Sequence, residues 1–239
     1  MEEVKQQRLK QETAQFNAMA SDWWDPKGSC RLLHDINPIR TQFIAERCSL
    51  QQKEVLDVGC GGGILAESLS RRGACVMGLD AAEQVIACAQ QHAHDQGLMI
   101  DYHVSTAEEW LKNNPDKAAA YDVVTCLELL EHLADPTSLI KTLSALIKPV
   151  GDLFLSSLNR SPKAFLFAII GVEYVFRWLP RGTHRYQDFI RPSELRAALQ
   201  AAGFAVEGIS GIEYHPVTRQ ARLTTSVEVN YLVHAKRLT

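Results

Sequence analysis

Three side chains that could carry out acid–base or metal chemistry lie close together in residues 127–132. If this segment begins a helical turn, Glu128, Glu131 and His132 occupy positions i, i+3 and i+4 and share one face. Such a carboxylate–histidine cluster can ligate a divalent cation, for example Mg²⁺, Mn²⁺ or Zn²⁺. Alternatively, His132 is a general base tuned by the two glutamates. The same spacing also occurs on solvated surfaces, where glutamates pair with Lys or Arg, so the spacing alone leaves three interpretations open.

A glycine-rich turn precedes this cluster. The apolar run 55–58 ends in Gly59, and Gly61 and Gly63 continue a G-x-G-x-G spacing before helical sequence resumes. A strand, a tight turn and a helix start form the place where open α/β sheets bind nucleotides, because glycine lets a ligand pass against bare backbone. Asp80 ends the next apolar run, where its carboxylate can accept hydroxyl protons of a ribose. We therefore predict an adenosine-type ligand. The alternative is an ordinary tight turn, with Asp80 as a helix N-cap.

The elements that must position these residues alternate along the chain. The sequence pattern predicts helices at 64–72, 82–96, 106–112, 136–148 and 193–202, and strands at 54–58, 74–79, 99–104, 121–126, 151–157, 204–214 and 226–236. This alternation predicts an α/β fold with a mostly parallel, seven-stranded sheet, helices on both faces and an antiparallel C-terminal strand. The carboxyl ends of parallel strands share one edge of the sheet, here called the ligand edge, where ligands bind in such folds. The glycine turn, Asp80 and the carboxylate–histidine cluster should meet there.

Composition restricts the class of protein. The chain has 239 residues, of which 46% are hydrophobic and 22% charged, as expected of a globular protein with a substantial core. Its net charge is −3 and it has no basic block, which argues against nucleic acid as a partner. None of the six cysteines forms a C-x-x-C pair, so we expect reduced thiols in a cytoplasmic protein. The polar N-terminus lacks the apolar segment of a signal peptide.

One segment is unusually apolar. We divide the chain into an N-terminal helical segment, residues 1–50, and an α/β domain, residues 51–239, with an apolar insertion at about 161–185. Projected as a helix, residues 162–181 are apolar nearly all round, so they should be buried or face something apolar outside the protein. The segment is too short to span a bilayer. Because arginines and lysines flank it, we predict that it binds an anionic membrane surface. The alternative is a core or dimer-interface helix.

Taken together, these features resemble the class I S-adenosylmethionine-dependent methyltransferases, whose first motif is an acidic residue followed by G-x-G-x-G. More narrowly, the chain is similar to the family that methylates ring hydroxyls of polyprenylated phenols and catechols in ubiquinone biosynthesis. The resemblance covers residues 12 to 236 and rests on residues 23–25, 33–34, 36–40, 56–67, 121–126, 131–132, 158–160, 182–184 and 229–231. The W-W-D and N-P-I-R sequences and the insertion are far more specific than the glycine motif.

This resemblance implies a reaction and the residues that perform it. It implies the class I methyltransferase fold for residues 51–239. It implies S-adenosyl-L-methionine as cofactor, in contact with Arg40, Gly59, Gly61, Asp80 and Leu127. It further implies that the carboxylate–histidine cluster is catalytic and holds a divalent cation, with Mg²⁺ the preferred choice. The implied substrate is a polyprenylated phenol or catechol, and the resemblance implies that this enzyme performs both O-methylation steps. The other implied partners are the inner face of the membrane and other enzymes of ubiquinone biosynthesis.

The implied chemistry fits these residue types. Methyl transfer is an in-line displacement at a sulfonium methyl, so much of the catalysis can come from positioning the two reactants. A phenol with a pKa near ~10 is a poor nucleophile at neutral pH. Either a metal on the catechol oxygens or His132 as a base must therefore favour the phenolate.

Three other functions compete with this interpretation. A nicotinamide oxidoreductase needs a G-x-G-x-x-G turn, which Ile64 and the absence of a second glycine turn from the sequence disfavour. A non-catalytic membrane-docking subunit would explain the insertion but not the intact glycine turn with Asp80. A C-methylating enzyme of quinone biosynthesis is the nearest rival, and the N-P-I-R sequence and the insertion favour oxygen as the methyl acceptor.

Overall fold

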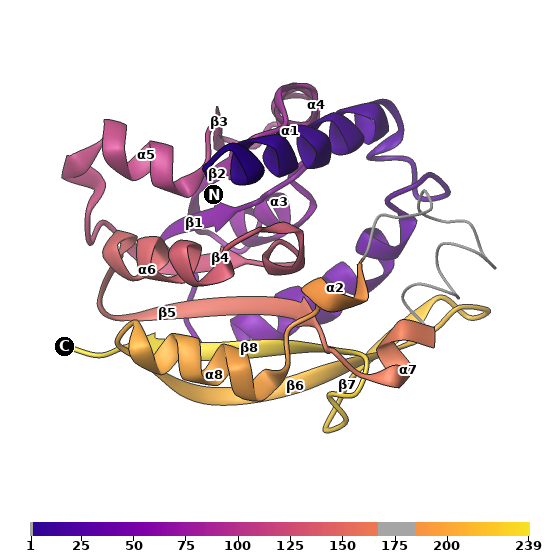
Figure 1. Ribbon diagram of the computed structural model, residues 1–239. Helices are drawn as coiled ribbons and strands as arrows, with labels where there is room; N and C mark the ends of the chain where they lie inside the picture. Colours follow the sequence, from indigo (N-terminus) through magenta and orange to yellow (C-terminus); the bar gives the residue numbers. More distant parts are fainter. Residues whose placement is uncertain (1, 167–184) are drawn as a thin grey trace.

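The computed structural model describes residues 2–166 and 185–239, in which helices cover both faces of one sheet (Figure 1). The helices (α), 3-10 helices (η) and strands (β) follow in the order α1 (Glu2–Met19), η1 (Ala20–Asp22), α2 (Arg31–Ala45), β1 (Glu54–Val58), α3 (Ile64–Ser70), β2 (Cys75–Asp80), α4 (Glu83–Asp95), β3 (Asp101–Val104), α5 (Ala107–Asn113), η2 (Pro115–Lys117), β4 (Tyr121–Cys126), η3 (Leu130–His132), α6 (Pro136–Leu146), β5 (Ile147–Leu158), α7 (Pro162–Ala164), η5 (Tyr186–Asp188), α8 (Pro192–Ala201), β6 (Phe204–His215), β7 (Gln220–Thr224) and β8 (Asn230–Arg237). Each helix and strand that the sequence predicted is present at or near its predicted position.

The sheet combines parallel and antiparallel strands, as the sequence predicted. Its strand order is β3-β2-β1-β4-β5-β8-β6-β7. Strands β1 to β5 pair in parallel, whereas β8 is antiparallel to both β5 and β6. This arrangement confirms an α/β fold with a mostly parallel sheet that is closed by antiparallel C-terminal pairing. It also differs from a dinucleotide-binding fold, which would repeat a second parallel half.

The sheet has eight strands rather than seven. The additional strand is β7, which pairs antiparallel with the second half of β6. The reversal between them is tight, because the backbone N–H of Arg219 donates to the carbonyl of His215 at 2.8 Å and Arg219 adopts φ +56°. The sequence pattern placed no strand between residues 214 and 226, although only the four residues between β6 and β7 reverse the chain.

Two apolar cores lie on opposite faces of the sheet. On one face, α5, α6 and α8 contribute residues such as Ala107, Leu143 and Leu199. On the other, α2 and α3 contribute residues such as Phe43 and Leu69. Figure 1 shows α6 and α8 in front of the strands and α2 behind β5 and β8. Because both faces are covered, the central strands β1 and β4 are buried along most of their length instead of alternating between buried and exposed residues.

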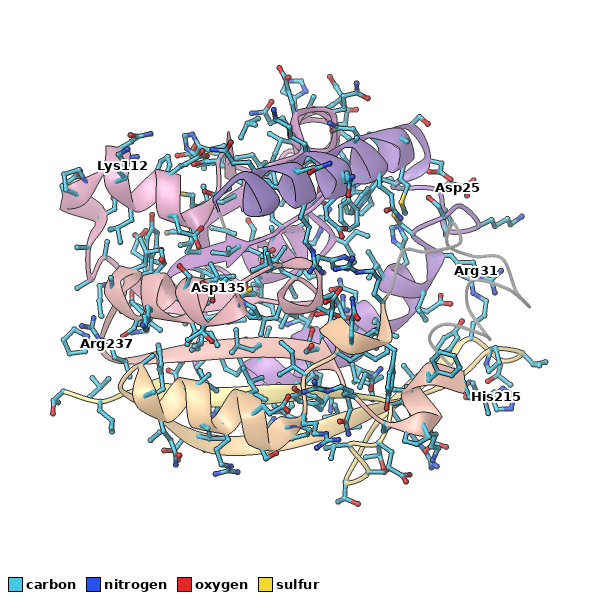
Figure 2. All side chains as sticks on the ribbon, in the orientation of Figure 1. Asp25, Arg31, Lys112, Asp135, His215 and Arg237 are labelled. Atoms are coloured by element: carbon cyan, nitrogen blue, oxygen red, sulfur yellow. The ribbon has the colours of Figure 1, made fainter. Side chains whose placement is uncertain are left out.

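The N-terminal part of the chain lies over the ligand edge. Helix α1 crosses the upper part of the molecule in Figure 1, and the Asn17 side chain accepts a hydrogen bond from the backbone N–H of Gln84 at 2.9 Å. At the start of α2, Asp35 receives a bidentate hydrogen bond from Arg219 at 2.7 and 3.0 Å. Arg219 also donates to the carbonyl of Pro26. Figure 2 accordingly shows Asp25 and Arg31 at the same end of the molecule as His215.

The division of the chain into an N-terminal helical segment and an α/β domain at residue 50 stays a prediction.

Most of the apolar insertion, residues 167–184, lies outside the described residues. At its described beginning, Phe165 and Leu166 are 42% and 53% exposed. The described cations at its two ends are paired within the chain, namely Arg160 with Glu194, Lys163 with Glu228, and Arg185 with Asp188. Within residues 2–166 and 185–239, no helix combines the length and the apolar character that crossing a membrane requires.

Candidate functional site

A cavity of about 1150 Å³ lies at the ligand edge. Its walls come from the carboxyl ends of β1, β2 and β4, from helices α1 and α2, and from the β6–β7 hairpin. The predicted site residues that line it are Arg40, Gly59, Gly61, Asp80, Leu127, Glu128 and His132. Glu131 is not among the lining residues. The structure therefore brings the predicted nucleotide turn and two members of the carboxylate–histidine cluster into one cavity.

Hydrogen bonds to residues of β2 hold the glycine turn in place. The backbone N–H of Gly59 donates to the carbonyl of Leu79 at 2.8 Å, and that of Gly61 donates to Oδ2 of Asp80 at 3.0 Å. Gly61 has φ +53°, and a Cβ atom on it would lie 2.4 Å from the Trp23 ring. Both the left-handed backbone and the lack of space require glycine at this position.

Two tryptophans also pack against the turn, namely those of the W-W-D sequence that supported the family resemblance but received no predicted role. Trp23 is 5% exposed and packs against Gly61 and Gly62. Trp24 donates its indole N–H to the carbonyl of Gly62 at 2.9 Å. Its ring stacks on His92 with centroids 3.5 Å apart and planes 6° from parallel. The two tryptophans of the W-W-D sequence therefore hold the glycine turn in place.

Asp80 lines the cavity and is not the N-cap of the helix that follows it. Helix α4 begins at Glu83 with Ala82 at its N-cap. Oδ1 of Asp80 accepts from the backbone N–H of Ala82 at 2.8 Å, and Oδ2 accepts from Gly61. Each carboxylate oxygen has a further lone pair that can accept a ligand hydroxyl. Burial raises the pKa of Asp80, whereas the backbone N–H donors act in the opposite direction.

Asp57 is a cavity residue that the sequence analysis did not select. It is 2% exposed at the end of β1, and Oγ1 of Thr125 donates to its Oδ1 at 2.6 Å. Burial raises the pKa of Asp57 to about 7, while the hydrogen bond from Thr125 and the charge of Arg40 lower it. Its position as the acidic residue before G-x-G-x-G was the signal that could have identified it.

The prediction that Glu128, Glu131 and His132 share one helical face is wrong. Glu128 has φ +53°, and η3 contains only the last two members of the cluster. The Glu128 carboxylate lies 2.9 Å from the Arg40 guanidinium and accepts from Oγ of Ser156 at 2.7 Å. The interpretation that a glutamate pairs with an arginine therefore holds for Glu128, although the pair is largely buried.

The two glutamates are held on different sides of β5. Oε2 of Glu131 accepts from Oγ of Ser157 at 3.2 Å, whereas Glu128 binds Ser156. Successive side chains of a strand point to opposite faces of the sheet. Within residues 2–166 and 185–239 no group of three His, Cys, Asp or Glu side chains is arranged to hold a metal ion. The donors present thus do not fit a divalent-cation site.

His132 lines the cavity together with Glu12 of α1, whose carboxylate contacts the imidazole. Its Nδ1 lies 3.0 Å from Oε2 of Glu12, and its ring meets that of Phe16 edge-on, with centroids 5.4 Å apart. Burial alone would lower the pKa of His132, but the hydrogen bond to Glu12 and the charges of Glu131, Glu12 and Glu128 outweigh it, so the pKa is raised. Sequence analysis missed Glu12, because 120 residues separate it from its partner and no motif includes it.

Comparison with known proteins agrees with this geometry. A family model described as a methyltransferase domain matches residues 30–208. Together with the sheet and the cavity, the match defines the chain as a class I S-adenosylmethionine-dependent methyltransferase. A solved magnesium protoporphyrin IX methyltransferase from Synechocystis PCC 6803 with bound SAH has a similar fold, with a TM-score of 0.62 and 20% identity over 90% of this chain and 87% of that chain.

Curated relatives define the family more narrowly. The ubiquinone biosynthesis O-methyltransferase of Marinobacter nauticus is 49% identical over 225 residues, which is 94% of each chain. The protein of the same name from Pseudomonas aeruginosa is 49% identical over 226 residues, covering 95% of this chain and 96% of the relative. The chain belongs to the family of ubiquinone biosynthesis O-methyltransferases.

Proposed function

We propose that this protein transfers the methyl group of S-adenosylmethionine to a ring hydroxyl of a polyprenylated phenol or catechol during ubiquinone biosynthesis. The observation that carries the proposal is one cavity lined by the glycine turn, by Asp80 and by His132. A cofactor site and a general base on the same cavity allow an oxygen nucleophile to be positioned and deprotonated together. The curated relatives of the same family support oxygen as the methyl acceptor.

The cofactor half of the cavity consists of the turn and its neighbours. We propose that Gly59 and Gly61, which line the cavity, contact the cofactor through their backbone and that Asp80 accepts the ribose hydroxyls. Leu127, which is 8% exposed at the end of β4, would contact the cofactor with its apolar side chain. For Arg40 we propose a supporting role, because its guanidinium is engaged with Glu128. Bound S-adenosylmethionine supplies an electrophilic methyl group on a sulfonium.

We propose that His132 acts as the general base. It lines the cavity, it is 8% exposed, and its pKa is raised by neighbouring carboxylates. A raised pKa makes the imidazole a stronger acceptor for the phenolic proton, provided that the ring is neutral before the reaction. The separated carboxylates of Glu128 and Glu131 do not support the divalent cation that the sequence resemblance implied, so no step is assigned to a metal.

The test is a methylation assay with labelled S-adenosylmethionine and a short-chain prenylated catechol, with and without EDTA. We expect the wild-type rate to survive EDTA. His132→Ala should lower kcat by about 10²–10⁴-fold, the usual contribution of a general base, while the affinity for S-adenosylhomocysteine stays unchanged. His94→Ala serves as the control, since His94 is 84% exposed. Loss of the wild-type rate in EDTA would establish a metal requirement, and full activity of His132→Ala would rule out the base.

We also propose that the apolar insertion docks the protein on a membrane surface, where a polyprenylated substrate resides. Exposure of Phe165 and Leu166 at its described beginning supports this role. The described cations beside it are engaged with carboxylates of the chain, so apolar burial should contribute more to binding than attraction to anionic lipid. Contacts with other enzymes of ubiquinone biosynthesis are a proposal that rests on the family alone.

A further inference from the structure

The cavity is larger than one cofactor requires. Its volume of about 1150 Å³ exceeds the roughly 300–1,000 Å³ that is usual for the pocket of a drug-sized ligand. The glycine turn and Asp80, which we propose to hold the cofactor, follow β1 and end β2. The β6–β7 hairpin also lines the cavity, although it lies at the other end of the strand order. The cavity therefore has a second part, between α2 and this hairpin, which we call the hairpin side.

The hairpin side has an apolar wall. Its lining includes Leu32 and Ile36 from α2, Ile212 and Tyr214 from β6, and Pro216 from the turn that follows β6. The first four of these residues are part of one apolar cluster, so α2 and the hairpin pack against each other. A wall of aliphatic and aromatic side chains fits an apolar ligand, because removing apolar surface from water favours binding.

Two polar residues on the hairpin side have partners within the protein. Oε2 of Glu213 accepts from the Arg222 guanidinium at 2.7 Å. Oδ1 of Asn230 accepts from the backbone N–H of Ile212 at 3.0 Å. The charge of Glu213 is therefore balanced without a ligand, and an apolar group can bind beside it without leaving a carboxylate unpaired.

The Tyr214 side chain is held at its polar tip. Its hydroxyl donates to Oδ2 of Asp35 at 2.6 Å, and Arg219 donates to the same carboxylate at 2.7 and 3.0 Å. Asp35 belongs to α2, so this contact joins the two walls of the hairpin side. Because the hydroxyl is fixed, the ring forms a preorganised apolar surface, and little conformational entropy is lost when a ligand packs against it.

The hairpin side is continuous with the described beginning of the apolar insertion. Lys163 donates to Oε2 of Glu228 at 2.8 Å, and the hydroxyl of Ser226 donates to the same oxygen at 3.2 Å. Both Lys163 and Ser226 line the cavity. Figure 1 shows α7 at the same end of the molecule as the β6–β7 hairpin. The cavity lining therefore runs from the insertion, which we propose to dock on a membrane, to the wall that contains Tyr214.

We propose that the hairpin side of the cavity binds the isoprenoid tail of the acceptor where the tail joins the ring, and that Tyr214 determines the preference for a tailed acceptor. This proposal rests on the proposed function, because it assigns a binding site to the tail of that acceptor. An isoprenoid tail is a hydrocarbon without hydrogen-bonding groups, so only apolar surface can recognise it. Binding energy from the tail would hold the ring in position for methyl transfer.

The experiment compares catechol with a catechol that carries one isoprenoid unit, both in solution without vesicles. Methylation assays give kcat/KM, and calorimetry in the presence of S-adenosylhomocysteine gives the affinity for each acceptor. Wild type should prefer the isoprenoid catechol by at least about tenfold in both measurements, as expected of an apolar group in a matching pocket.

Variants of the wall should change this preference. Leu32→Glu places a carboxylate in the wall and should reduce the preference to about threefold or less. Tyr214→Ala should have a similar effect, because it removes the ring. Tyr214→Phe keeps the ring and should retain most of the preference, even though it loses the hydrogen bond to Asp35. Leu238→Glu is the matched control and should keep the wild-type preference, since Leu238 is 56% exposed and is not among the residues that line the cavity.

The outcomes separate tail binding from folding and from catalysis. Wild-type affinity for S-adenosylhomocysteine in Leu32→Glu would show that the protein is folded, and if this affinity is lost, the comparison of Tyr214→Ala with Tyr214→Phe decides. A wild type without preference for the isoprenoid catechol, or an undiminished preference in Tyr214→Ala, would overturn the tail site. A wild type that binds the isoprenoid catechol with the expected dependence on Tyr214 but does not methylate it would instead overturn the proposed function.

Discussion

At the scale of single residues, Asp80 lines the cavity and holds the backbone at two points. One carboxylate oxygen fixes Gly61 of the glycine turn and the other fixes Ala82 before α4. These contacts leave lone pairs that can accept the ribose hydroxyls. Substitution by alanine would remove both functions at once. Asparagine is the more informative change, because its amide keeps the shape of the side chain but can accept hydrogen bonds through only one of its two terminal atoms.

We expect Asp80→Asn to weaken binding of S-adenosylhomocysteine by roughly 10- to 100-fold, since a hydrogen bond to a charged group contributes about 1.5–3 kcal/mol. Calorimetric titration measures the change. Asp95→Asn is the control, because Asp95 has a side chain that is 57% exposed. Unchanged affinity in Asp80→Asn would remove Asp80 from the cofactor site, and tight binding of NAD by the wild type would contradict the class of ligand.

At the scale of elements, the site depends on how the tryptophan pair is seated on the glycine turn. The turn alone has the backbone geometry of a nucleotide site, but Trp23 occupies the space directly against Gly61 and Gly62. The stacking of Trp24 on His92 ties the same segment to α4. Helix α1 ends just before this tryptophan segment. A change in the packing of α1 should therefore also change the shape of the glycine turn.

Gly61→Ala tests this link. The added Cβ would meet the Trp23 ring at 2.4 Å and would also require φ +53° from alanine. We expect a loss of stability of about 1–3 kcal/mol, a changed tryptophan fluorescence spectrum and weaker cofactor binding. Gly97→Ala is the control that introduces backbone strain without a steric contact. Gly97 has φ +65°, but no atom lies within 4 Å of its added Cβ. Gly97→Ala should lose stability only. Equal cofactor affinity in both variants would show that the tryptophan contact does not shape the turn.

At the scale of the whole molecule, the proposed membrane docking of the apolar insertion would bring a lipid substrate to the cavity. The lining of the cavity extends from the glycine turn to Lys163 in the described beginning of the insertion, and to Leu158 and Val229, which belong to the same apolar cluster as Ala164. A polyprenylated ring could therefore enter the site from a membrane on which the insertion is docked.

We expect the protein to sediment with phosphatidylglycerol vesicles and Leu166→Glu to bind them at least about tenfold more weakly, since burying a charged group in place of a leucine is unfavourable. Because the described flanking cations are paired, neutral vesicles should bind the wild type within about tenfold of anionic ones. Turnover of a long-tailed substrate should fall in Leu166→Glu more than turnover of a water-soluble catechol. If wild type stays in the supernatant, or if both substrates are affected equally, the insertion is a structural or dimer-contact segment. The substitution Ile169→Glu addresses the same question at a position outside the described residues.

Local sequence determined the supporting framework of the site. The apolar strands, the glycine turn and Asp80 at the end of β2 were predictable, because strand periodicity and glycine geometry act over a few residues. The missed strand β7 shows the limit of such patterns. It depends on a four-residue reversal after His215 and on pairing with β6, and neither has a strong composition signal.

Only the tertiary structure decided what the carboxylate–histidine cluster does. Helical spacing suggested one shared face, but Glu128 takes a left-handed backbone conformation, and adjacent serines of β5 hold Glu128 and Glu131 on opposite sides of the sheet. Arg40 reaches Glu128 from α2, and Glu12 reaches His132 from α1. These pairings join residues that are far apart in the chain. Spacing along the sequence records which side chains are neighbours within an element, whereas charge pairing across a cavity depends on how separate elements pack.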